Sequence, residues 1–304
     1  MRDGMEIFVN RWAPDEEEEV KGLVQLHHGL AEHSMRYDRL GSVLAENGYV
    51  LNAYDLRGHG KTAENAEKNG TGLFGKLADK DGFNIVVDDL NEITEDLKKT
   101  YPGKKTILFG HSFGSFVSQG YIEKYGKNID ACILCGTAGP QQPLMAAGNF
   151  LAKLIKLFRG GNTIVPMLSK LSFGSYCNRI ENPETPNDWL SLNKANRQMY
   201  EMDNWCGIPL TVSFFCDLTG GVHQIHKAKN MKKVPLDLPI LFIWGAEDPV
   251  GGYGKTIKNL ADIYKKNGVK NIEMIEYPND RHEILNEDDK EKVEADILNY
   301  LAKI

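Results

Sequence analysis

The chain has 304 residues, 41% of them hydrophobic and 26% charged, and its net charge is −6, from 36 basic and 42 acidic side chains. This composition is typical of a folded globular protein and excludes a disordered or fibrous chain. The acidic balance disfavours a nucleic-acid partner, because proteins that bind nucleic acids usually carry a basic excess.

The number of cysteines and the length of the apolar runs bear on the cellular compartment of the protein. Residues 1–12 lack the apolar stretch of a cleavable signal, and no apolar run approaches the ~20 residues of a membrane helix. Five cysteines, an odd number, predict free thiols in a reducing, cytoplasmic environment. Cys132 and Cys135 form a CxxC inside an apolar run. Because residues three apart on a strand point to opposite faces, we expect both in the core and not on a metal.

Short apolar runs predict strands along the chain. Alternating Met5, Ile7 and Val9 predict a first strand within residues 1–12. Further strands are predicted at residues 23–27, 49–54, 106–109, 131–134, 240–244 and 272–275. Their near-continuous apolar content suits a parallel sheet covered on both faces.

Amphipathic helices are predicted between these strands. Val86, Leu90, Ile93 and Leu97 recur at helical spacing, and a similar stripe at residues 293–301 predicts a C-terminal helix. The alternation of strands and helices predicts an α/β fold with a mostly parallel central sheet flanked by helices.

The alternation stops between residues 140 and 233. We therefore predict a core of residues 1–139 and 234–304, with a helical cap, residues 140–233, inserted between two strands. The cap begins with an apolar helical stripe of Phe150, Leu151, Leu154, Ile155 and Phe158. This stripe could hold an acyl chain over a site or pack against the core. The neighbouring Lys153, Lys156 and Arg159 could face solvent or an anionic membrane surface.

The segment Gly110-His-Ser-Phe-Gly114 matches the pattern G-x-S-x-G. In that pattern a sharp turn between a strand and a helix exposes the serine hydroxyl. A predicted strand precedes the segment and helical spacing follows it. Ser112 is therefore the candidate nucleophile, and a glycine turn with an incidental serine is the alternative.

A serine nucleophile needs a histidine base, which in turn needs an acid to fix its tautomer. The expected chain order is serine, acid, histidine. His282 follows the strand at 272–275 and is the expected base. Asp248 follows the strand at 240–244 and is the expected acid, ahead of Glu247 and Asp280.

An oxyanion hole requires two backbone N–H groups aimed at the developing charge. One is expected from Phe113, the residue after the nucleophile. The other is expected from Leu30, in the turn that follows the strand at residues 23–27.

Five segments carry a family resemblance: His28–Ser34 followed by Arg36-Tyr37, Asp55–Gly60, Gly110–Gly114, Gly245–Pro249, and Tyr277–Asn286. With them the sequence resembles the monoacylglycerol lipase and lysophospholipase branch of the α/β-hydrolases, which has serine aminopeptidase-like relatives. The resemblance implies that fold, the triad and the oxyanion donors given above. It also implies a polar glycerol pocket that includes Glu32 and Arg36, for which a loop-holding salt bridge is the alternative.

We therefore expect a serine hydrolase that cleaves carboxylic esters of monoacylglycerol or lysophospholipid without a metal or organic cofactor. An esterase of small or aromatic esters and an aminopeptidase-like hydrolase are alternatives within the family. A non-catalytic binding module is an alternative of another class, because one fold hosts many functions.

Overall fold

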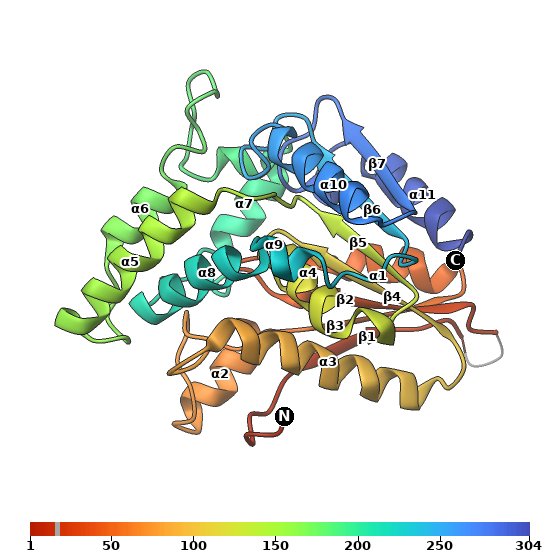
Figure 1. The fold of residues 1–304 in the computed structure, drawn as a ribbon, viewed down its shortest axis with the longest axis horizontal. Helices are drawn as coiled ribbons and strands as arrows, with labels where there is room; N and C mark the ends of the chain where they lie inside the picture. The colour runs from red at the N-terminus through yellow and green to blue at the C-terminus, as the bar shows by residue number, and fades with distance from the viewer. Residues whose placement is uncertain (16–18) are drawn as a thin grey trace.

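The computed structural model describes residues 1–15 and 19–304, in which helices cover both faces of a seven-stranded sheet (Figure 1). The strands are β1 (Val9–Trp12), β2 (Gly22–His27), β3 (Tyr49–Tyr54), β4 (Lys105–His111), β5 (Ala131–Cys135), β6 (Ile240–Gly245) and β7 (Ile272–Tyr277). They pair in the order β1-β3-β2-β4-β5-β6-β7, and only β1 runs antiparallel to its neighbour. The predicted α/β-hydrolase fold is confirmed.

The connections between strands are mostly helical. The α-helices are α1 (Asp38–Glu46), α2 (Gly60–Lys68), α3 (Gly82–Thr100), α4 (Phe113–Tyr125), α5 (Gln142–Arg159), α6 (Pro166–Phe173), α7 (Lys194–Met202), α8 (Val212–Ile225), α9 (Ala228–Met231), α10 (Lys255–Asn267) and α11 (Lys290–Leu301). Short 3-10 helices are η1 (Ser34–Tyr37), η2 (Gly126–Asn128), η3 (Asp188–Leu190) and η4 (Ile284–Asn286).

The first predicted strand is only partly correct. The strand begins at Val9, and its four residues pair with Leu51–Tyr54 of β3. Just before it, the N–H of Phe8 donates to the Thr62 hydroxyl at the start of α2, so the chain leaves the sheet there. Of the alternating residues Met5, Ile7 and Val9, only Val9 therefore lies within the strand.

Two apolar layers hold the helices to the sheet. One face of the sheet packs against α3, α4, α8 and α10, and the other against α1 and α11. Each large side chain buried in this way stabilises the fold by about 1.5–3 kcal/mol. Because both layers are apolar, β2 to β6 are buried along nearly their whole length, as the sequence predicts.

Cys132 and Cys135 lie on β5, where both are buried and free. Cys132 contacts the layer of α3, α4, α8 and α10, whereas Cys135 contacts the opposite layer of α1 and α11. The expectation that the CxxC pair points to opposite faces of a buried strand is confirmed.

The predicted cap, residues 140–233, contains α5 to α9. Helix α8 packs against α3 and α4, and α5 packs on α8, while α5 and α6 extend away from the sheet on the left of Figure 1. The apolar stripe of α5 is divided between two environments. Leu151 and Ile155 pack against the core, whereas Phe150 and Phe158 are 71% and 78% exposed.

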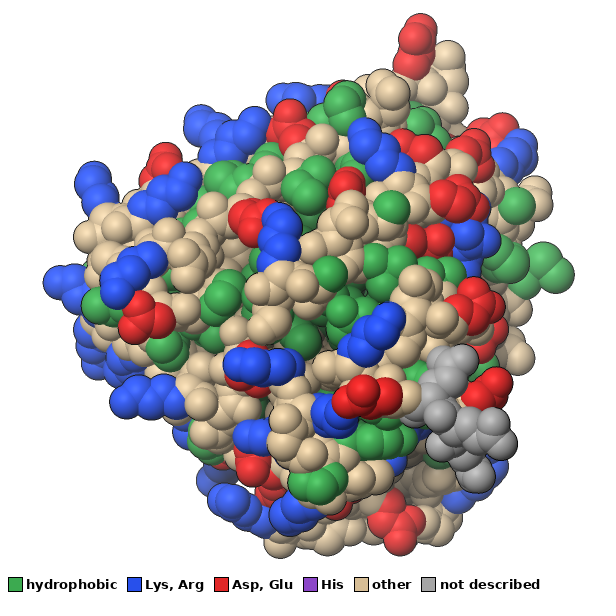
Figure 2. Space-filling view, turned by 90° about the vertical axis from the view of Figure 1, so that its right-hand side faces the viewer, with side chains coloured by type: hydrophobic (Ala, Val, Ile, Leu, Met, Phe, Trp, Pro, Cys, Tyr) green, Lys and Arg blue, Asp and Glu red, His purple; other side chains and the backbone are tan. Residues whose placement is uncertain are grey.

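The surface carries mixed charge. Figure 2 shows acidic and basic side chains interspersed over most of one face, with apolar side chains between them. Within the described residues, no helix has the length and apolar character needed to cross a bilayer.

Candidate active site

Ser112 stands on a sharp turn between β4 and α4. Its backbone has φ +54° and ψ −118°, a conformation that costs a non-glycine residue about 1–3 kcal/mol. The flanking glycines make the turn possible, because a Cβ at Gly114 would collide with the carbonyl oxygens of His27 and His28. The Ser112 N–H donates to the carbonyl oxygen of Cys135 at 3.0 Å, which fixes the turn against β5.

His282 and Asp248 are brought together from the ends of β7 and β6. The His282 Nδ1 lies 2.9 Å from the Asp248 Oδ2, and both residues are buried. The other carboxylate oxygen of Asp248 accepts the N–H of Val250 at 2.8 Å, which fixes its orientation. Because a carboxylate only accepts, we assign the ring proton to Nδ1, so that Nε2 carries the lone pair. Within the described residues, Nε2 is buried and has no hydrogen-bond partner.

The other two carboxylates considered as the acid have different environments. The Glu247 N–H donates to the carbonyl oxygen of Asp280 at 2.9 Å, so these residues meet through their backbones. Burial raises the pKa of Asp280 to about 7, with the nearby charges of Asp289 and Glu287 adding to the effect. Asp248 is thus the one of the three candidates that is hydrogen-bonded to His282.

The imidazole of His282 lies close to two aromatic rings. The ring centroid of His111 is 4.8 Å away and that of Trp189, in η3 of the cap, is 4.9 Å away. The cap is also joined to this loop through the backbone, because the Glu283 N–H donates to the carbonyl oxygen of Leu190 at 2.7 Å. Trp189 could not be found from the sequence, since no local pattern marks a cap residue that packs on a distant loop.

Both segments expected to supply the oxyanion donors lie close to Ser112. Phe113 is the first residue of α4, so its N–H has no acceptor within the helix and lies at the positive end of the helix dipole. Gly29 packs against the nucleophile, since a Cβ placed on it would lie 3.1 Å from the Ser112 Cβ. Leu30 follows Gly29 directly, so the turn after β2 reaches the same region as the serine.

Glu32 and Arg36 form a buried ion pair at 2.8 Å. Glu32 also accepts the N–H of Gly29 at 2.5 Å and the hydroxyl of Tyr37 at 2.8 Å, so it holds the turn that carries Leu30. Burial alone would raise the pKa of Glu32, but its contacts with His111 and Arg36 outweigh burial and lower it. This geometry matches the loop-holding alternative, while a glycerol-binding role for the pair stays a prediction.

Arg36 extends the same network to the loop of His282. Its guanidinium donates to both carboxylate oxygens of Glu283, at 2.6 and 2.7 Å, and to the Asn196 side chain of α7 at 3.1 Å. It also lies over the ring of Tyr200, 5.0 Å from its centroid. Neither Glu283 nor Asn196 was predicted as a site residue from the sequence. The position of Glu283 next to His282 was the available signal.

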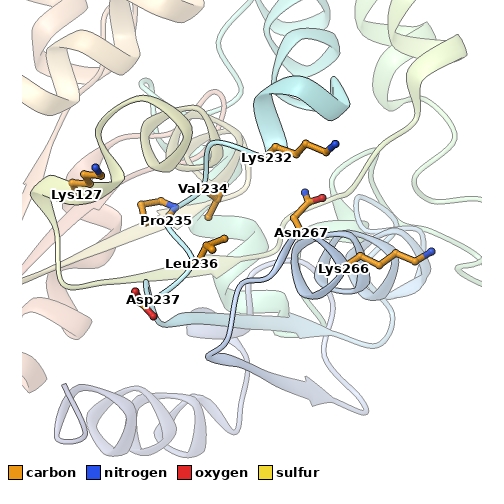
Figure 3. Close-up of a pocket in the computed structure, with 8 residues that line it drawn as sticks. All are labelled: Lys127, Lys232, Val234, Pro235, Leu236, Asp237, Lys266 and Asn267. Carbon is orange, nitrogen blue, oxygen red and sulfur yellow. The ribbon is translucent and has the colours of Figure 1, made fainter.

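A surface pocket of about 760 Å³ lies near the amino-terminal end of β6, away from the carboxyl ends of the strands. Its lining comes from the segment that leads into β6, from η2, from the end of α10 and from Lys232, which follows α9, as Figure 3 shows. Parallel strands of an α/β sheet present their sites at their carboxyl ends, where Ser112, Asp248 and His282 lie. None of these three residues lines the pocket, which is therefore separate from the candidate active site.

The chain is similar to several known hydrolases. A family model described as serine aminopeptidase, S33, matches residues 18–289. A monoglyceride lipase of Rattus norvegicus is 26% identical over 247 residues, which cover 81% of this chain and 71% of the relative. A monoacylglycerol lipase of Mycolicibacterium smegmatis is 23% identical over 314 residues, covering 98% and 94%.

A solved esterase structure is also similar to this chain. The carboxyl esterase of Bacillus coagulans in complex with glycerol superimposes with a TM-score of 0.89 and 29% identity, covering 97% of this chain and 93% of that one. The chain therefore belongs to the serine aminopeptidase S33 family, among the α/β-hydrolases similar to monoacylglycerol lipases, and is an ester-hydrolysing enzyme.

Proposed function

We propose that the protein is a serine esterase that hydrolyses monoacylglycerol or lysophospholipid through Ser112, His282 and Asp248. The observation that carries the proposal is the contact between His282 Nδ1 and Asp248, which leaves the lone pair of Nε2 unused at the edge of the sheet where Ser112 stands. This is the arrangement that a serine needs in order to lose its proton to a base.

The reaction takes two steps. His282 Nε2 accepts the proton of Ser112 Oγ as the oxygen attacks the ester carbonyl, and the N–H groups of Leu30 and Phe113 bind the developing oxyanion. The imidazolium then protonates the leaving alcohol, and the acyl group stays on Ser112. A water molecule releases the acid by the same route in reverse, with Asp248 holding the imidazole in place throughout.

Three observations favour a glyceryl ester over an aminoacyl substrate. The similar lipases are named for monoglycerides, and the similar esterase structure contains glycerol. An aminopeptidase must bind the ammonium group of its substrate, and an unpaired carboxylate is the group suited to that. Glu32 and Glu283 both accept hydrogen bonds from Arg36, so neither of these carboxylates is unpaired.

The test is hydrolysis of 1-monoacylglycerols of increasing chain length, compared with lysophosphatidylcholine, p-nitrophenyl acetate and aminoacyl-nitroanilides. The expected result is the highest kcat/KM on a glyceryl or lysophospholipid ester, abolished by Ser112→Ala and unchanged by Ser42→Ala, which alters an exposed serine of α1. Preferred cleavage of the nitroanilides would contradict the substrate class. Fluorophosphonate labelling that persists in Ser112→Ala would contradict the nucleophile.

We also propose that α5 and α6 contact a membrane surface transiently. Their exposed apolar side chains are Leu144, Phe150, Leu154, Leu157, Phe158, Met167 and Leu171. Exposed Lys153 and Arg159 lie among them on α5 and would attract anionic headgroups. A lipid ester dissolved in the bilayer would then be taken up at the surface where the enzyme docks.

The cysteines support a reducing compartment such as the cytoplasm, which we propose as the location. All five thiols are free, and Cys132 and Cys135 are buried in the core where neither has a disulfide partner among the described residues. Fractionation of the native cells, with fluorophosphonate labelling as the readout, tests this location.

A further inference from the structure

Three side chains with metal-binding atoms meet where the cap touches the loop after β2. His33 belongs to that loop, while Asp203 and Cys206 belong to the turn that follows α7. One ligand atom from each lies within 4.8 Å of the other two, and the His33 Nε2 is 2.8 Å from the Asp203 Oδ2. The serine mechanism uses none of these atoms.

The carboxylate of Asp203 is held in a fixed orientation by two hydrogen bonds. The Trp205 N–H binds Oδ1 at 2.8 Å, which leaves Oδ2 directed at His33. The side chain of Asp203 is 34% exposed, so a cation can reach it from solvent.

The imidazole of His33 is oriented before any ligand arrives. It is buried, and the ring of Trp205 packs against it edge to face with centroids 5.3 Å apart. Among the described residues, its Nδ1 has no hydrogen-bond partner. The ring proton can therefore move to Nδ1, because no neighbouring donor already occupies that nitrogen, and Nε2 is then free to act as a ligand.

We propose that His33, Asp203 and Cys206 bind a thiophilic divalent cation, Zn²⁺ or Cd²⁺, with water completing the coordination. Imidazole, carboxylate and thiolate are all zinc ligands, and three protein ligands plus water is a common arrangement at open zinc sites. The thiolate selects against Mg²⁺ and Ca²⁺, which prefer oxygen ligands.

Binding of the cation releases one proton. Metals bind the thiolate form of cysteine, so the proton of the Cys206 thiol passes to solvent as the sulfur–metal bond forms.

The bound cation would cross-link the cap to the loop that carries Leu30. The two segments already meet, because the Gly207 N–H and the Tyr200 hydroxyl both donate to the carbonyl oxygen of Ala31, at 2.9 and 3.1 Å. A ligand that binds only the folded arrangement raises the melting temperature. Zn²⁺ is therefore expected to stabilise the protein against heat.

The experiment titrates the full chain, freed of metal by a chelator and kept in thiol-free buffer, with Cd²⁺. Thiolate-to-cadmium absorption reports the sulfur–metal bond directly. The expected result is one equivalent bound, with affinity at least tenfold lower in Cys206→Ser and in Asp203→Asn. Cys177→Ser, which alters another partly exposed thiol, serves as the matched control and should titrate like the unaltered chain.

A second measurement does not depend on variants that fold. Saturating Zn²⁺ should slow the alkylation of Cys206 in the unaltered protein at least tenfold and leave Cys177 and Cys216 unaffected, as read by mass spectrometry of peptides. Unchanged alkylation of Cys206, or Cd²⁺ absorption that is equal in the unaltered chain and in a folded Cys206→Ser variant, would overturn the proposal.

Discussion

The guanidinium of Arg36 donates hydrogen bonds to both carboxylate oxygens of Glu283 and also to Glu32. It therefore connects the turn that contains Leu30 to the residue next to His282. These two loops carry the proposed oxyanion donor and the proposed base. Because bidentate contacts between guanidinium and carboxylate fix geometry as well as charge, the pair sets the distance between the two loops.

Replacing Arg36 by Met should destabilise the fold and slow turnover together. The change leaves two buried carboxylates without their cation, and breaking a buried pair on one side costs about 3–5 kcal/mol. Urea unfolding followed by circular dichroism measures the loss. Lys270→Ala, which removes an exposed pair with Asp237, is the control and should change stability by at most about 1 kcal/mol. Equal effects of the two changes would contradict the buried network.

Asp248→Asn should lower kcat by about 10⁴-fold with little change in KM, because the amide can donate to His282 Nδ1 and so favours the wrong tautomer. Steady-state kinetics on a soluble p-nitrophenyl ester measures this. Asp280→Asn, the matched change at the other candidate, should keep kcat within a few-fold. A larger loss in Asp280→Asn than in Asp248→Asn would reverse the assignment of the acid.

The buried His59 makes stability depend on pH. Burial lowers its pKa to about 3, with the charge of His28 adding to the effect, so the folded chain leaves it neutral while the unfolded chain protonates it below about 6.5. Its contribution to stability is therefore complete above pH 6.5 and is lost as the pH falls toward 3.

The stability difference between the unaltered chain and His59→Asn tests this sign. It should stay constant between pH 7.5 and 8.5 and shift in favour of the variant by roughly 2 kcal/mol at pH 5, since only the unaltered chain gains a proton there on unfolding. Urea midpoints across this range provide the measurement. A difference that does not change with pH would show that His59 is not held neutral by burial.

If α5 and α6 contact a membrane, vesicle binding and ester hydrolysis should respond differently to changes on these helices. The double change Leu157→Ser and Phe158→Ser removes two side chains that are 77% and 78% exposed. It should weaken binding to vesicles that contain anionic lipid at least fivefold and leave hydrolysis of a soluble ester unchanged. Leu236→Ser, which alters an exposed leucine of the pocket in Figure 3, is the control and should bind vesicles normally. Cosedimentation gives the comparison.

The strands of the sheet could be predicted from the sequence because a buried strand is marked by the apolar residues within its own segment. Residues 49–54 form β3 with the predicted bounds, since a parallel strand covered on both faces reads as a continuous apolar run. The first strand was predicted too long, because an edge strand with one packed face alternates in the same way as the loop before it. Ser112, Asp248 and His282 could be proposed because Ser112 directly follows β4, and the other two lie in the loops that follow β6 and β7.

The contacts between the loops could not be predicted from the sequence. Arg36 and Glu283 are 247 residues apart, and neither lies in a pattern that specifies its partner. Trp189 reaches His282 from a cap segment without strand–helix alternation, so only the folded chain shows that the two rings meet. Periodicity reports whether a side chain is buried, but not which distant side chain it meets.

The backbone of Ser112 implies that the proposed nucleophile lowers the stability of its own protein. At φ +54° a serine is held where glycine rests without penalty. Ser112→Gly should therefore be inactive and more stable than the unaltered enzyme, whereas Ser112→Ala should be inactive without that gain. At this residue, the side chain proposed for catalysis lowers the thermal stability of the protein. The more stable and inactive glycine variant would therefore suit structural studies with an intact bound substrate.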